Sequence, residues 1–146
     1  MSRSGYSDDC CCDSNWPWIM YRGAVKSSLR GKRGQAFLKE MLEAMDALPE
    51  KRLVPNELEQ EGSYCALGTV GAKRGIDMKE LDPEDSSTVA NVFGIAEVMA
   101  REIVYMNDEN CDYIYDELTR NYWPITPEER FANMRAWIVS EIKQNV

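Results

Sequence analysis

Basic and aromatic side chains near the start of the chain are the residues best suited to bind another molecule. No acidic residue occurs between Ser14 and Lys39, and this window holds a basic stripe flanked by two tryptophans. The residues of this stripe and its flanks are Trp16, Trp18, Arg22, Lys26, Arg30, Lys32 and Arg33. Cations at this spacing can neutralise phosphates while aromatic rings stack on exposed bases. The same side chains could instead pair with acidic segments of the chain itself, and the sequence leaves both interpretations open.

The sequence contains no recognisable catalytic motif. The 146 residues include no histidine, which is the side chain most used for proton transfer near neutral pH. The 25 acidic residues match no phosphate-binding loop, serine-hydrolase motif or dinucleotide fingerprint. A calcium loop that starts at Asp108 is excluded, because Tyr113 and Thr119 stand where glycine and glutamate are required. We therefore expect no catalytic residue, no metal site and no cofactor.

The five cysteines indicate free thiols rather than a disulfide framework, because their number is odd and three of them are consecutive. Cys10, Cys11 and Cys12 could in principle bind a soft metal through thiolates. Adjacent cysteines point in divergent directions, however, whereas zinc sites space their ligands by two or more residues. The surrounding segment is rich in Ser, Asp and Gly and has no apolar period, so a flexible tail over residues 1–15 is the preferred prediction.

Composition predicts one folded domain over residues 16–146. The chain is 44% apolar and 29% charged, as folded proteins usually are. Its net charge is −8, so the part of the chain outside the basic stripe is strongly anionic. No apolar run approaches the roughly 20 residues that a membrane-spanning helix needs, and the N-terminus lacks the apolar core of a secretory signal. A cytoplasmic location follows as an expectation.

Helical periodicity accounts for most of the chain. Apolar residues recur at helical spacing, with proline, acidic or hydroxyl residues at the starts of several segments. The expected helices cover residues 17–30, 37–48, 66–74, 83–93, 95–106 and 127–142. A short β-hairpin is expected around residues 52–66, and residues 107–122 are expected to form a loop with one helical turn. The sequence therefore predicts a mainly α fold with five to six helices in one compact domain.

Four sequence blocks together resemble a known family. The blocks read RGAVKSSLRGKRGQAFLKEMLEAMDALPEKRL, YCALGTVGAKRGIDM, FGIAEVMAREIVYMND and TPEERFANMRAWI. In this order they resemble a family of small uncharacterised proteins encoded by tailed bacteriophages and prophages of Gram-negative bacteria, from about Gly5 onward. The sequence departs from that family at residues 10–12 and 111–123. The resemblance implies a phage protein that works in the bacterial host cytoplasm, and it implies no mechanism.

Three functional hypotheses remain. The first is a non-enzymatic interaction protein that binds a host or phage protein, one version being an inhibitor of a bacterial defence system of the anti-CRISPR or anti-restriction type. The second is a nucleic-acid-binding accessory protein that uses the basic first helix. The third is an enzyme that uses carboxylates around a metal. No membrane partner is expected, and the sequence does not indicate an oligomeric state.

Overall fold

The computed structural model describes residues 3–6, 16–110 and 112–143. Within these residues six α-helices and two antiparallel hairpins form the mainly α fold that the sequence predicts. The helices are α1 (Trp16–Arg30), α2 (Lys32–Asp46), α3 (Ala66–Arg74), α4 (Ser86–Phe93), α5 (Glu97–Asp108) and α6 (Pro127–Glu141). The strands are β1 (Glu59–Gln60), β2 (Ser63–Tyr64), β3 (Tyr113–Asp116) and β4 (Asn121–Pro124), and a short 3-10 helix, η2, spans Met78–Glu80.

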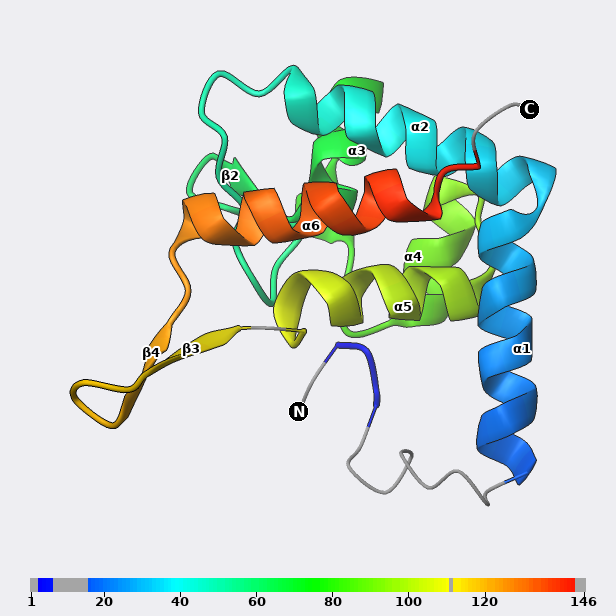
Figure 1. Cartoon of the computed structure of the whole chain (residues 1–146). Coiled ribbons are helices and arrows are strands. Elements are labelled where there is room, and N and C mark those ends of the chain that lie inside the picture. The colour runs from blue at the N-terminus through cyan, green and yellow to red at the C-terminus, as the bar shows by residue number, and fades with distance from the viewer. Residues whose placement is uncertain (1–2, 7–15, 111, 144–146) are drawn as a thin grey trace.

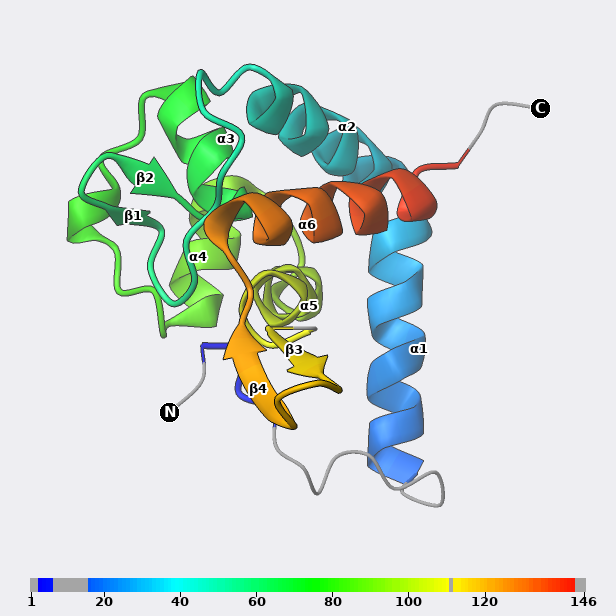
Figure 2. The same ribbon diagram turned by 60° about the vertical axis from the view of Figure 1, so that its left-hand side comes forward.

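The helices pack around α5 in a crossed arrangement. Helices α2 and α6 run side by side, and α5 lies directly beneath α6 (Figure 1). Helix α1 stands across the ends of α2 and α5 and contacts both of them. The β3–β4 hairpin projects away from this helical body in Figure 1 and lies below α5 in Figure 2. The fold therefore presents a helical body with one protruding arm.

One buried core joins all six helices. Its most deeply buried side chains include Leu38 of α2, Ile103 of α5 and Ile138 of α6, each with 0% of its surface exposed. Each side chain of this size contributes about 1.5–3 kcal/mol when it is fully buried. The core contains residues of the first and the last helix, so helices that are far apart in the sequence pack against one another through their apolar faces.

Local signals place most helix boundaries close to their predicted positions. At the start of α6 the Thr126 hydroxyl accepts a hydrogen bond from the Glu129 N–H at 3.1 Å. The Glu129 carboxylate in turn accepts from the Thr126 N–H at 3.0 Å, which completes a capping box. Helix α4 begins at Ser86 rather than near residue 83, because the Asp85 side chain provides its cap.

The first hairpin confirms the expectation for residues 52–66. Strands β1 and β2 pair antiparallel, with Glu59 opposite Tyr64 and Gln60 opposite Ser63. Each strand has only two residues, so this hairpin serves as a tight turn ahead of α3.

The expectation of a loop over residues 107–122 is wrong. Helix α5 continues to Asp108, and strands β3 and β4 form a second hairpin. The strands escaped detection because a half-buried strand alternates apolar and polar residues, whereas this hairpin carries aromatic residues on both faces.

The expectation of a flexible tail over residues 1–15 does not hold for residues 3–6. Arg3 is 4% exposed and Ser4 is 1% exposed, and this segment runs beneath α5 (Figure 1). The segment is held by side chains far away in the sequence, which local composition cannot indicate. The remainder of the predicted tail, including Cys10, Cys11 and Cys12, lies outside the described residues.

Candidate functional site

Helix α1 divides the predicted binding residues between an inner and an outer side. Its inner side buries Val25 and Leu29 in the core. Its outer side exposes Trp16 at 67%, and the neighbouring Ile19 and Met20 are 44% and 59% exposed. Apolar side chains of this size normally turn inward, so the N-terminal half of the outer side forms an exposed apolar patch.

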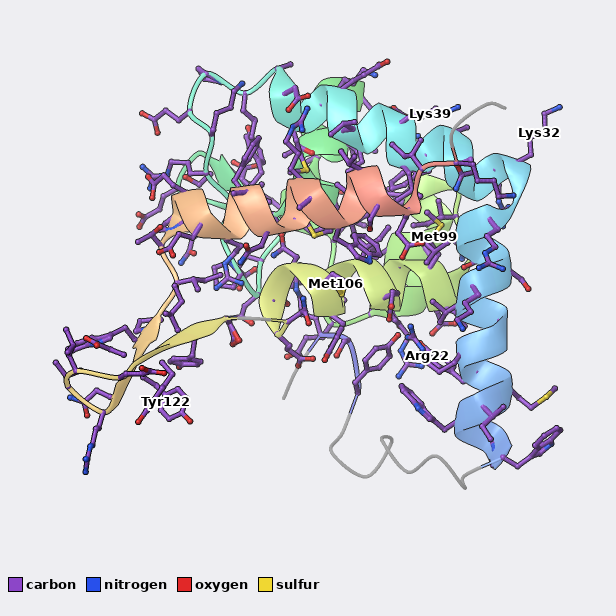
Figure 3. The ribbon with its side chains drawn as sticks, in the orientation of Figure 1. Arg22, Lys32, Lys39, Met99, Met106 and Tyr122 are labelled. Carbon is purple, nitrogen blue, oxygen red and sulfur yellow. The ribbon has the colours of Figure 1, made fainter. Side chains whose placement is uncertain are left out.

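Arg22 belongs to the inner side and is held in an internal ion pair. Its guanidinium donates two hydrogen bonds to the Glu102 carboxylate of α5, at 2.7 and 2.9 Å. Glu102 is only 5% exposed, and the hydrogen bonds to it raise the pKa of Arg22. Figure 3 shows Arg22 directed from α1 toward α5. This member of the stripe therefore neutralises a buried carboxylate of its own chain.

Trp18 covers that ion pair as part of an aromatic cluster. Its ring stacks on Tyr21 with 5.5 Å between centroids, and Tyr6 meets it edge-on at 5.7 Å. The Tyr21 hydroxyl donates to the Tyr6 oxygen at 2.9 Å, and the Tyr6 hydroxyl donates to Glu102 at 2.9 Å. Burial is the main cause that raises the pKa of both tyrosines. Trp18 thus supports the packing of the N-terminal segment against α1.

Arg3 anchors the N-terminal segment in a buried polar site. Its guanidinium donates to both oxygens of Asp108, at 2.7 and 2.6 Å, and to the Cys65 sulfur at 3.7 Å. Asp108 also accepts from the Asn56 N–H at 3.1 Å and from the Asn107 amide at 2.9 Å. Burial alone would lower the pKa of Arg3, but its contacts with Cys65 and Asp108 raise that pKa above its ordinary value.

Sequence reasoning missed this anchor, because Arg3 and Asp108 are separated by 105 positions. Arg101 reinforces it, with its Nε donating to the Ser4 carbonyl at 2.7 Å. The Arg101 guanidinium also lies 5.6 Å from the Tyr6 ring centroid. Arg3 stands in a segment rich in serine and aspartate, where an arginine side chain is normally exposed to solvent. No local sequence signal therefore predicts that Arg3 is buried.

The remaining cations of the stripe gather where α1 meets α2. We call Lys26, Arg30, Lys32 and Arg33 the basic corner. All four are exposed, and none pairs with a carboxylate among the residues that the structure describes. Figure 3 shows Lys32 extending outward from this corner. The Lys143 ammonium adds a further cation by donating to the Arg30 carbonyl at 2.7 Å.

The local backbone at the corner suits an anionic ligand. Helix α2 starts at Lys32 without a side-chain cap or an acidic residue in its first turn, so no side chain of that turn offsets its positive dipole end. Gly34 allows the two helices to meet, because a Cβ there would lie 1.9 Å from the Ser28 carbonyl oxygen. A shallow hollow of about 210 Å³ beside this junction is lined by Lys32 and Arg33, among others.

Acidic side chains form no candidate metal centre in the part of the chain that the structure describes. No group of three or more histidine, cysteine, aspartate or glutamate residues converges there. A second hollow, of about 430 Å³, lies beside the end of α2 and contains Glu50 and Arg52, which pair with each other at 3.3 Å. Neither hollow brings together an acid and a base free to act on a substrate.

The β3–β4 hairpin exposes a second set of aromatic residues that sequence reasoning did not select. Tyr113 lies opposite Pro124, Ile114 opposite Trp123, and Tyr115 opposite Tyr122. Because cross-strand partners share a face, the tyrosines occupy one face and the Ile114–Trp123 pair the other. Exposed fractions of these side chains run from 47% to 69%, so neither face is covered by the described body. We call residues 113–124 the hairpin arm.

Comparisons with protein-family models, with curated proteins and with solved structures found no match to this chain. Across the described helices, none combines the length and the apolar character that a bilayer crossing requires.

Proposed function

We propose that this chain is a non-enzymatic interaction protein that binds a host or phage macromolecule through the outer side of α1 and the basic corner. The observation that carries the proposal is the exposed apolar patch of Trp16, Ile19 and Met20 on α1. The same helix carries Lys26 and Arg30, which pair with no carboxylate among the described residues. The chain as a whole is acidic, with a net charge of −8, so the charge of this surface is opposite in sign to the net charge. Apolar area supplies binding free energy, while the cations steer an acidic partner to the surface.

The choice of a partner from the bacterial host rests on the sequence resemblance rather than on the geometry. Resemblance to phage-encoded proteins supports a partner in the bacterial host, and a defence protein with an acidic surface is one target of this kind. An inhibitor of such a system needs a binding surface and no catalytic group, which fits the residues of α1.

Affinity capture from phage-infected bacteria tests the proposal. Tagged wild-type protein should recover a specific host or phage macromolecule. The double variant Lys26→Glu with Arg30→Glu should lose that partner, because it reverses two charges on the outer side of α1. Lys79→Glu reverses one exposed lysine on a different element, η2, and as a control it should retain the partner. Absence of any partner above background, or equal recovery by all three proteins, would contradict the proposal.

Nucleic acid is a second candidate partner, favoured by one specific observation. The start of α2 has no side-chain cap, and its first residues line the hollow together with the Lys32 and Arg33 side chains. The N-terminal end of a helix is a favourable place for a phosphate. Two cations that each neutralise one phosphate of duplex DNA contribute about −1.8 to the slope of log affinity against log salt.

Gel-shift measurements over a range of salt concentrations test this candidate. The double variant Lys32→Gln with Arg33→Gln should bind more weakly and with a slope about 1.8 smaller. Lys79→Gln should behave as wild type. If the protein does not bind nucleic acid, or if the binding does not depend on salt, nucleic acid is excluded as the ligand.

A further inference from the structure

The hairpin arm exposes large apolar side chains on both of its faces. Its side chains Tyr113, Ile114, Tyr115, Tyr122 and Trp123 are each 47–69% exposed, and Leu118 at the tip is 96% exposed. An isolated two-stranded hairpin is marginally stable in water, and this one carries apolar side chains on both faces. Figure 3 shows Tyr122 on the arm, away from the helical body. Such an arm is typical of a segment that is covered by another chain.

The hydrogen-bonding register shows which edge of the arm is open. The Ile125 N–H donates to the Asp112 carbonyl at 2.9 Å, so these two residues form a hydrogen-bonded pair just before β3. Hydrogen-bonded and non-hydrogen-bonded pairs alternate along an antiparallel ladder. The Tyr113–Pro124 and Tyr115–Tyr122 pairs are therefore non-hydrogen-bonded. Their backbone groups point away from the partner strand, toward the outer edges.

The two outer edges differ in their capacity to accept another strand. On β3 the outward groups are the N–H and C=O of both Tyr113 and Tyr115, and β4 is the only described strand that pairs with β3. On β4 the outward positions are Tyr122 and Pro124, and proline has no N–H to donate. The edge of β3 is thus the one that can extend the sheet.

We propose that the β3 edges of two copies of this chain pair antiparallel about a two-fold axis, joining two hairpin arms into one four-stranded sheet. With the axis at Ile114, Tyr113 of one copy lies opposite Tyr115 of the second copy, and the two tyrosines exchange main-chain hydrogen bonds. Strand β3 of each copy contacts β3 of the other, so the contact is isologous and forms a closed, symmetric dimer. Ile114 then meets its own counterpart on the opposite face, flanked by the two Trp123 rings.

The apolar area that this pairing can cover is that of a small interface. At about 200 Å² for a large apolar side chain, the exposed fractions of the four apolar residues at the contact, Tyr113, Ile114, Tyr115 and Trp123, amount to roughly 400 Å² per copy. A standard interface buries about 800 Å² per partner, so this contact relies on the main-chain hydrogen bonds of the β3 edge as well as on apolar area.

The same register makes a distinctive prediction about salt. It places Asp112 of one copy opposite Asp116 of the second copy, and like charges in cross-strand positions repel. Dissolved salt screens this repulsion without weakening the apolar contacts. The dimer should therefore become tighter as ionic strength rises, in contrast to binding at the basic corner.

The experiment compares two proline variants of the full chain by light scattering over a wide range of concentrations. Tyr115→Pro and Tyr122→Pro each remove one ring of the same cross-strand pair, whose centroids are 5.0 Å apart, and one outward N–H. They differ only in the edge that they block. Wild type and Tyr122→Pro should reach twice the chain mass of 16.7 kDa, whereas Tyr115→Pro should stay monomeric or raise the dissociation constant at least tenfold.

Hydrogen exchange provides a readout that does not depend on the variants. The amides of Tyr113 and Tyr115 should become protected as the concentration of wild-type protein rises, while that of Tyr122 should not. Circular dichroism checks that both variants keep the helical body. A wild type that remains monomeric at every concentration would overturn the proposal. So would a dimer that Tyr115→Pro leaves intact, because it would have to form through another surface.

Discussion

Replacing Arg3 by methionine should remove much of the protein's stability, although the sequence places this residue in a loose tail. Arg3 and Asp108 are 4% and 6% exposed and share two hydrogen bonds of 2.7 and 2.6 Å. Breaking a buried pair by removing one partner costs about 3–5 kcal/mol, because the other charge remains buried. Asp108 keeps its hydrogen bonds from Asn56 and Asn107, so we expect about 3 kcal/mol for Arg3→Met.

Urea unfolding followed by circular dichroism measures this effect. With a slope of about 2 kcal/mol per molar urea, a loss of 3 kcal/mol lowers the unfolding midpoint by about 1.5 M. The double variant Arg3→Met with Asp108→Asn should recover part of the loss, because it no longer buries a lone carboxylate. Arg33→Met replaces an exposed arginine and should change stability by less than about 0.5 kcal/mol. If Arg3→Met behaved like Arg33→Met, the N-terminal segment would not anchor the fold.

Local contacts lead to three smaller predictions. Gly68→Ala should destabilise the fold by about 1–3 kcal/mol in urea unfolding, since its Cβ would lie 1.9 Å from the Leu58 carbonyl oxygen. Thr126→Ala removes the cap of α6 and should lower the free energy of unfolding by about 1 kcal/mol in the same assay. The hydrogen-bonded pair with Arg74 lowers the pKa of Glu40 below its ordinary value. Glu40→Gln should therefore cost about 0.5 kcal/mol at neutral pH and nothing once the pH falls below that lowered pKa, and an equal cost at both pH values would contradict the pairing.

The helical part of the fold was predictable because its signals are local. The apolar period of α2 and the capping box at Thr126 are each defined by residues close together in the sequence. These signals therefore do not depend on where the segment lies in the fold. The basic stripe was also visible in the sequence, since charge and spacing need no tertiary information. What the sequence left open was whether its cations face solvent or a carboxylate of the same chain.

Only the tertiary structure decided which residues of the stripe are available to a partner. Arg22 turns inward because α5 brings Glu102 beside it, whereas Lys26 and Arg30 stay on the outer side of α1. The hairpin arm was missed for a related reason. Apolar and polar residues alternate along a strand when one face is buried and the other is exposed, and here both faces are exposed. The sequence by itself determined the helices and the charge pattern, since these depend on neighbours along the chain. The buried Arg3–Asp108 pair and the division of the stripe depend on neighbours in space, and folding alone brings those together.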